Sequence, residues 1–199
     1  AQIEASLERV RSSALAMQKP SDMLDVCHII SDQLQLLNIK DLRNVQTLVI
    51  NAGKYEYVNY QYFTIYDKTS VEVIDYRLHP VELALAEQML ASSEAFYSKT
   101  FEGDELQKWR DHRRKTNQRA DPRLDEAASA YYYFFSIGAG ALGVTAFSPL
   151  DENALNTFKR FRNVFELAYK RYIDIEQANF QAQEARIEAA LERVRGKAM

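Results

Sequence analysis

YYYFFSIGAGALGVTAFSPLDENALNTFKRF, residues 131–161, is the stretch that decides the fold. Its first seven residues and the segment 141–147 are rich in β-branched and aromatic side chains, which favour strands. Between them lies Gly138-Ala139-Gly140, which is typical of a tight hairpin turn. Asp151 can then cap a helix that nothing in the sequence breaks until Gly196. The stretch therefore predicts a hairpin followed by one very long helix.

The chain before this stretch alternates between strand-like and helical patterns. Residues 45–51 and 55–67 are rich in Val, Ile, Tyr and Phe and are separated by AGK, which predicts another hairpin. Apolar residues at helical spacing predict a helix capped by Ser21. The same spacing recurs over 81–94, and further strands are expected over 71–78 and near 95–101. Together these elements predict an α+β fold.

The two ends of the chain have nearly the same sequence. IEASLERVRSSAL (3–15) and IEAALERVRGKAM (187–199) match at nine of thirteen positions. In the second copy Ile187, Leu191, Val194 and Ala198 have the 4-3-4 spacing of a coiled-coil seam. We expect these terminal helices to be linkers that join modules of a longer array and pair two copies of the chain in a homodimer. The alternative is an antiparallel hairpin of the two ends within one chain.

Composition limits the partners. The chain has 199 residues, a formal net charge of −3 and an estimated pI of 5.7, so it lacks the basic excess that binds phosphate backbones. It has no long apolar run for a bilayer and no signal-peptide core. Its single cysteine, Cys27, fits a reducing compartment. We therefore expect a cytoplasmic protein with no nucleic-acid partner and no direct membrane contact.

One family resemblance follows from the order of elements and from the segment GAGALGVTAFSPLDENALNTFKRF (138–161). The chain resembles the GAF domain over residues 20–172, and the flanking EASLERVR and EAALERVR are similar to linkers of bacterial sensor proteins. The resemblance implies a central antiparallel sheet, a dimerising bundle of terminal helices on one face and a small-molecule pocket on the other. It divides the chain into an N-terminal linker helix (1–19), a sensory domain (20–172) and a C-terminal coiled-coil helix (173–199).

Basic residues gather in KWRDHRRKTNQR (108–119). Arg110 and Arg113 could clamp a phosphate or carboxylate, with Trp109 stacking on a base. A solvated helix face explains the same residues, and this segment is either exposed or a cover over the sheet. We include Trp109, Arg110 and Arg113 among the candidate ligand-binding residues.

Tyrosines supply the other candidates. Side chains on a strand alternate between faces, so Tyr60 and Tyr62 share one face, as do Tyr131 and Tyr133. If one face of the sheet lines a pocket, these hydroxyls can reach a ligand. Packing in the core is the alternative.

Sharper chemical motifs are absent from the sequence. GAGALG (138–143) matches the phosphate-binding pattern G-x-G-x-x-G, but VTAFS follows it instead of a helix, so we interpret it as a hairpin. Cys27 lies on an apolar stripe, which indicates a buried small side chain rather than a nucleophile. His79 and His112 lack metal-ligand spacing. We predict no catalytic residue, no metal and no cofactor.

The sequence therefore predicts a non-catalytic sensory module of a signal-transduction protein. A small-molecule ligand of unknown identity would alter the domain, and the terminal helices would pass that change to a histidine kinase or cyclase output domain. The alternative function is a purely structural dimerisation module without a ligand.

Overall fold

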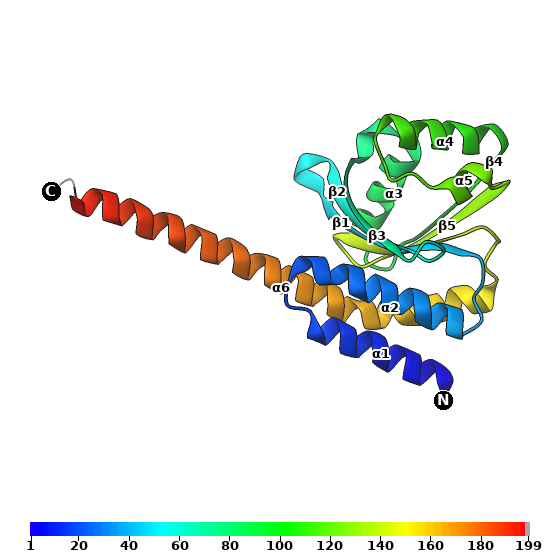
Figure 1. Cartoon of the computed structure of the whole chain (residues 1–199), viewed down its shortest axis with the longest axis horizontal. Helices are drawn as coiled ribbons and strands as arrows, with labels where there is room; N and C mark the ends of the chain where they lie inside the picture. The colour runs from blue at the N-terminus through cyan, green and yellow to red at the C-terminus, as the bar shows by residue number, and fades with distance from the viewer. Residues whose placement is uncertain (198–199) are drawn as a thin grey trace.

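The computed structural model describes residues 1–197 and has the predicted α+β architecture (Figure 1). Six strands form one antiparallel sheet in the order β3-β2-β1-β6-β5-β4. The strands are β1 (Leu42–Asn51), β2 (Glu56–Phe63), β3 (Lys68–Asp75), β4 (Phe96–Glu102), β5 (Ser129–Ser136) and β6 (Gly140–Ala146). The helices are α1 (Gln2–Ala16), α2 (Met23–Leu36), α3 (Pro80–Ala91), α4 (Gly103–Lys115), α5 (Pro122–Glu126) and α6 (Glu152–Lys197).

Helices cover both faces of the sheet and make three layers. α1, α2 and the first half of α6 form a bundle on one face, and their apolar stripes meet Val45, Leu142 and Val144 of the central strands. α3 and α4 cover the other face, where Leu48 and Phe134 belong to a second apolar cluster. Because successive side chains of a strand point to opposite faces, the buried central strands supply both cores.

The hairpins form where the sequence predicted them. β1 and β2 are joined by a short helical turn, Ala52–Lys54, and Tyr55 takes a left-handed conformation to complete it. β5 and β6 are joined through GAG, and Gly138 has a φ of +96°, which a side chain rarely allows. No helix starts after that turn until α6, so the hairpin interpretation of GAGALG is confirmed.

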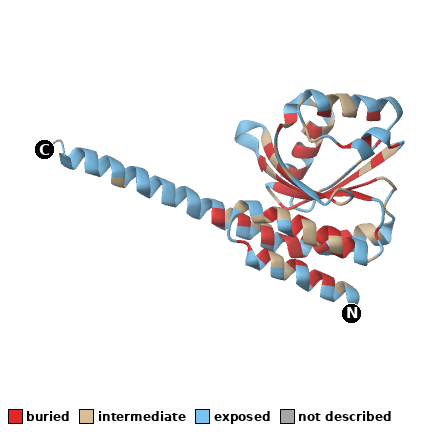
Figure 2. Ribbon diagram, viewed as in Figure 1, coloured by how far each residue is buried: buried red, intermediate tan, exposed pale blue. Residues whose placement is uncertain are grey.

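α6 is the long helix expected from the sequence, and it has 46 residues. Its buried side chains run from Phe158 to Ile175, and it then continues away from the body as an exposed rod (Figure 2). The predicted seam residue Ala198 lies outside the described residues, as does the end of the predicted segment 173–199.

α1 lies alongside the first half of α6 and runs parallel to it (Figure 1). Glu4 forms an ion pair with Arg160, and Arg171 donates to the carbonyl of Met17 at 3.0 Å. Over residues 1–197, the two similar ends therefore do not pair with each other in an antiparallel hairpin. Val10 and Ala14 of α1 are completely buried in the same core as α2 and α6.

Candidate functional site

A small cavity of about 40 Å³ lies between the sheet and the helices α3 and α4. Leu48, Leu85, Phe101 and Phe134 give it apolar walls. Its other walls are polar, which is unusual for space between a sheet and its covering helices. The polar residues are Arg43, Gln46, Tyr57, Asn59, Gln61, Glu82, Tyr97, Lys99, Trp109, Arg113, Gln118 and Tyr132.

Strand alternation puts a row of buried amides on this face of the sheet. Asn59 donates to Gln46 Oε1 at 2.9 Å, and Asn44 donates to Gln61 Oε1 at 3.0 Å. Gln61 in turn donates to Glu72 of the edge strand at 2.9 Å. The Oδ1 atoms of Asn44 and Asn59 are buried without a hydrogen-bond partner in residues 1–197. An unpaired buried acceptor costs about 1–3 kcal/mol, and of these two residues only Asn59 lines the cavity.

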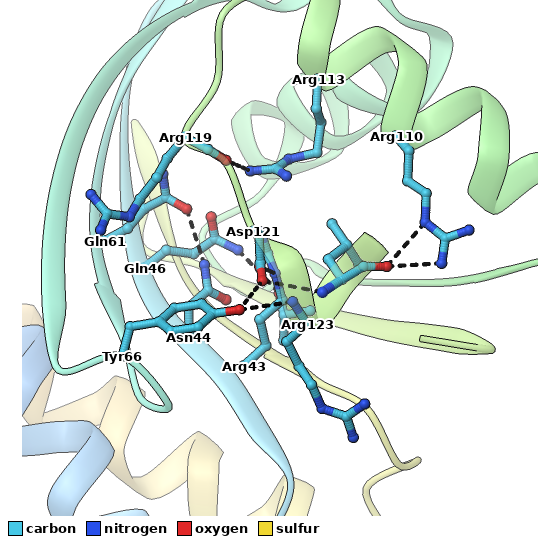
Figure 3. A network of polar contacts seen from close by, with 12 residues as sticks. Arg43, Asn44, Gln46, Gln61, Tyr66, Arg110, Arg113, Arg119, Asp121 and Arg123 are labelled. Carbon is cyan, nitrogen blue, oxygen red and sulfur yellow. Dashed lines mark hydrogen bonds and ion pairs between the residues drawn. The ribbon is translucent and has the colours of Figure 1, made fainter. Parts of the chain in front are cut away.

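An ion pair joins the sheet to the segment that follows α4 (Figure 3). Arg43 Nε lies 2.6 Å from Asp121 Oδ2, and both side chains are almost fully buried. Asp121 Oδ1 also accepts hydrogen bonds from the Leu124 amide at the start of α5 and from the Tyr66 hydroxyl. Burial raises the pKa of Asp121, but the Arg43 guanidinium more than offsets this, so the pKa stays below its ordinary value. The pair fixes residues 116–121 over the sheet.

Arg113 reaches from α4 toward the cavity and is only 7% exposed. Its Nη2 donates to the carbonyl of Arg119 at 2.9 Å, as Figure 3 shows. Within residues 1–197 no carboxylate oxygen lies within 4 Å of its guanidinium, in contrast to Arg43. Burial and the nearby Arg43 charge lower the pKa of Arg113. Arg113 thus makes no ion pair in residues 1–197, and the charges of Asp121 and Glu72 act on it only from beyond 4 Å.

Glu82 of α3 closes another side of the cavity and is 2% exposed. Its Oε2 lies 3.1 Å from His112 Nε2, and Gln118 donates to its Oε1 at 3.3 Å. Burial raises the pKa of Glu82 to about 7, and burial together with His79 lowers that of His112 to about 4. Near neutral pH the contact therefore joins a neutral imidazole to a carboxyl group that is close to half protonated.

The seven predicted ligand residues separate between the two faces of the sheet. Trp109 and Arg113 line the cavity, and Trp109 stacks on Phe101 with 4.9 Å between ring centroids while its Nε1 donates to Tyr132 at 2.9 Å. Arg110 points outward and donates to the carbonyls of Leu124 and Ala127, so it holds the end of α5.

The four predicted tyrosines lie on the bundle face, away from the cavity. Tyr60 and Tyr133 are buried in the core between the sheet and the bundle, and Tyr131 packs against the same core. The Tyr60 hydroxyl lies 3.1 Å from that of Tyr172 in α6, and Tyr62 stacks on His28 of α2. These four tyrosines therefore do not line the cavity. Strand alternation does put each pair on one face, but that face meets the helical bundle.

The tyrosines that do line the cavity are Tyr57, Tyr97 and Tyr132, and sequence reasoning missed them. A signal was present in EYVNYQYF (56–63), where Asn59 and Gln61 alternate with Tyr60 and Tyr62. Polar residues at every second position of a strand that is buried on both faces indicate a polar interior site. The buried partners Arg43 and Asp121 carry no such signal, because 78 residues separate them.

Cys27 is a buried small side chain, as predicted. It has no exposed surface, and its Sγ lies 3.3 Å from Thr47 Oγ1. Burial raises the pKa of the thiol to about 12, so it stays protonated and unreactive near neutral pH. In the described part of the chain, no helix combines the length and apolar character that crossing a bilayer requires.

No protein-family model matches this sequence, and none of the curated proteins is similar to it. The resemblance to GAF domains thus rests on the sequence features and stays a prediction.

Proposed function

We propose that this chain is a non-catalytic sensory module of the GAF type that binds a small molecule in the cavity between the sheet and α4. The bound state alters the sheet, and α6 carries the change to an output domain of the histidine kinase or nucleotide cyclase class. The module acts in the cytoplasm as a homodimer, without nucleic acid or direct membrane contact. One observation carries this proposal. The continuous helix α6 packs on the face of the sheet opposite to the cavity, and it then continues away from the body as an exposed rod.

A chain of buried contacts supports coupling between the cavity and α6. α3 supplies Glu82 and Leu85 to the cavity wall. At the far end of α3, the Met89 carbonyl accepts a hydrogen bond of 2.6 Å from Ser136 of β5. The Ser136 carbonyl in turn accepts from Nε of Arg162 in α6 at 2.9 Å. A shift of α3 on binding would therefore act on α6 through two hydrogen bonds.

Arg162 strengthens this connection. It is 5% exposed, and its Nη2 donates to the carbonyl of Ser93 at 2.6 Å. The same guanidinium thus holds both the end of β5 and the loop that follows α3. Such a residue ties the helical bundle to the opposite layer of the fold.

The exposed part of α6 supports dimerisation. Ile187, Leu191 and Val194 are each more than half exposed, and they lie on one stripe. Burying such side chains between two helices is worth about 1.5–3 kcal/mol each. A second copy of the chain, laid alongside, would cover them.

Removing residues 184–199 tests the proposal. We expect the shortened chain to keep its melting temperature, since the rod contributes nothing to the core, and to lose only the helical circular dichroism signal of the deleted residues. It should dimerise more weakly in analytical ultracentrifugation. Equal dimerisation of the two forms would contradict a role of the rod in pairing. The ligand is sought by native mass spectrometry of the freshly purified chain.

A structural dimerisation module without a ligand is the second candidate, and one observation favours it. The cavity of about 40 Å³ is little larger than one water molecule's share of the liquid, about 30 Å³. A crystal structure in which ordered water alone fills the cavity, together with no small-molecule stabilisation in a thermal-shift screen, would support this second function over the first.

A further inference from the structure

We propose that the ligand of the cavity is a small planar oxyanion, a carboxylate of formate or acetate size, held by the guanidinium of Arg113. This inference rests on the proposed ligand-binding function and names the chemical class of the ligand.

The first argument is the charge of the cavity walls. Three cationic side chains line the cavity: Arg43, Lys99 and Arg113. Arg43 pairs with Asp121 at 2.6 Å, and Lys99 pairs with Glu105 at 2.6 Å. Among residues 1–197, Arg113 has no such carboxylate and makes one hydrogen bond, to a carbonyl. Asp121 and Glu72 compensate the charge of Arg113 only from beyond 4 Å, so an anion bound directly beside the guanidinium would supply the contact partner that Arg43 and Lys99 already have.

The second argument is the supply of hydrogen-bond donors. A guanidinium carries five N–H groups in a planar fork that matches the two oxygens of a carboxylate. Burial keeps the pKa of Tyr57 well above its ordinary value, so its hydroxyl stays a donor. The Tyr132 hydroxyl accepts from Trp109 and keeps its own proton available to a second acceptor. These two hydroxyls and Arg113 all line the same cavity.

Glu82 does not oppose an anion at mildly acidic pH. It is the carboxyl group of the cavity wall, and burial raises its pKa to about 7. At pH 6 it is mostly a neutral acid and therefore does not repel a negative charge.

Size and access limit the ligand further. A volume of about 40 Å³ limits the ligand to the smallest carboxylates, and the apolar wall made by Leu48 and Phe134 can contact a C–H or methyl group. Arg113 and Gln118 also line an open surface pocket of about 320 Å³. Arg110, Arg114 and Arg119 line that outer pocket together with Asp121 and Asp125. With Arg113 the pocket keeps an excess of positive charge, which would draw anions toward the two side chains that separate it from the cavity.

Isothermal titration calorimetry and thermal shift at pH 6 and constant ionic strength test the proposal, with sodium formate, sodium acetate and neutral acetamide as probes. We expect formate or acetate to bind and to raise the melting temperature, and acetamide to do neither. Loss of one charge-assisted bidentate contact corresponds to a tenfold to hundredfold weaker affinity, on the order of 1.5–3 kcal/mol. Arg113→Met should show that loss, and Arg113→Lys should bind with intermediate affinity.

Two features keep the test decisive. Arg113→Met removes an unpaired buried charge and so should fold at least as stably as the parent chain. The control Arg77→Met removes the same charge from an exposed position beyond β3 and should bind the anions unchanged. Equal binding by Arg113→Met and the parent chain, or equal affinity for acetate and acetamide, would overturn the proposal.

The outcomes separate this inference from the proposed function. If neither anion binds but a different small molecule co-purifies in the cavity, the anion inference fails and the sensory function stands. If the carboxylate binds through Arg113 but leaves the dimerisation of the full chain unchanged, the inference stands and the relay through α6 fails.

Discussion

The segments 3–11 and 187–195 have the same sequence except for Ser6 in the first and Ala190 in the second, yet their environments are opposite. Leu7 is 6% exposed and its counterpart Leu191 is 51% exposed. Val10 is completely buried, whereas Val194 is 68% exposed. Figure 2 shows the difference, with buried residues along α1 and an exposed surface along the end of α6. An apolar stripe thus determines which face of a helix can be buried, and the neighbouring elements determine whether that face is buried.

The neighbours of the first copy explain its burial. α1 fits against α2 and the first half of α6, where Arg9 also reaches Gln33. Within residues 1–197 the second copy has no such helices beside it. Matched substitutions in the two copies can therefore measure what the environment alone contributes.

The largest expected difference in stability between the two copies comes from a charge placed at Val10 and at its counterpart Val194. Val10→Asp buries an unpaired carboxylate and should cost more than about 4 kcal/mol of unfolding free energy, enough to unfold most of the chain. Val194→Asp should change the stability by less than about 0.5 kcal/mol, since the side chain stays in water. Urea unfolding followed by circular dichroism at low protein concentration measures both. Similar losses in the two variants would show that the copies are equally buried.

A cavity-forming pair should give a smaller difference. Leu7→Ala removes a buried side chain and should cost about 2–5 kcal/mol, while Leu191→Ala should leave the unfolding free energy almost unchanged. Thermal unfolding at several protein concentrations checks this pair. A concentration-independent loss in Leu191→Ala would indicate that the rod packs on its own body.

For self-association the second copy, and not the first, should be the sensitive one. Leu191→Glu places a charge in the predicted seam and should weaken dimerisation at least tenfold, about 1.4 kcal/mol, without lowering the stability of the monomer. Ala189→Glu adds the same charge to the opposite side of the helix and is the matched control. Sedimentation equilibrium distinguishes the two, and equal weakening by both would argue against a specific seam.

The smallest expected difference concerns a surface ion pair. Glu4 pairs with Arg160 of α6, so Glu4→Gln should cost up to about 1 kcal/mol, and Glu188→Gln in the second copy should cost nothing measurable. A double-mutant cycle with Arg160→Met isolates the pair. High salt should remove the difference, and its persistence at 1 M NaCl would mean that packing, not charge, accounts for it.

Periodicity predicted the α+β class, both hairpins and the length of α6, because each depends on a local pattern of apolar residues. It did not find α5, which has five residues and is fixed by the distant Arg43 through its cap Asp121. Short helices held by tertiary contacts leave little local signal.

The candidate site was only partly predictable for a related reason. Trp109 and Arg113 were selected from the basic segment 108–119, and both line the cavity. For the tyrosines, alternation fixes which residues share a face but not which core that face meets. That choice depends on which helices cover each side of the sheet, and this is a property of the whole fold.

The length of α6 beyond the body has a mechanical consequence. After Ile175, the last buried residue of the helix, 22 residues continue to Lys197, and at 1.5 Å per residue they form a lever arm of about 33 Å. Tilting this arm by about 5° at its base would swing its tip by roughly 3 Å, whereas side chains near the fulcrum would move by only a fraction of an ångström. A tilt of α6 that is small enough to leave the close-packed interior intact therefore becomes a larger displacement at Ile187, Leu191 and Val194.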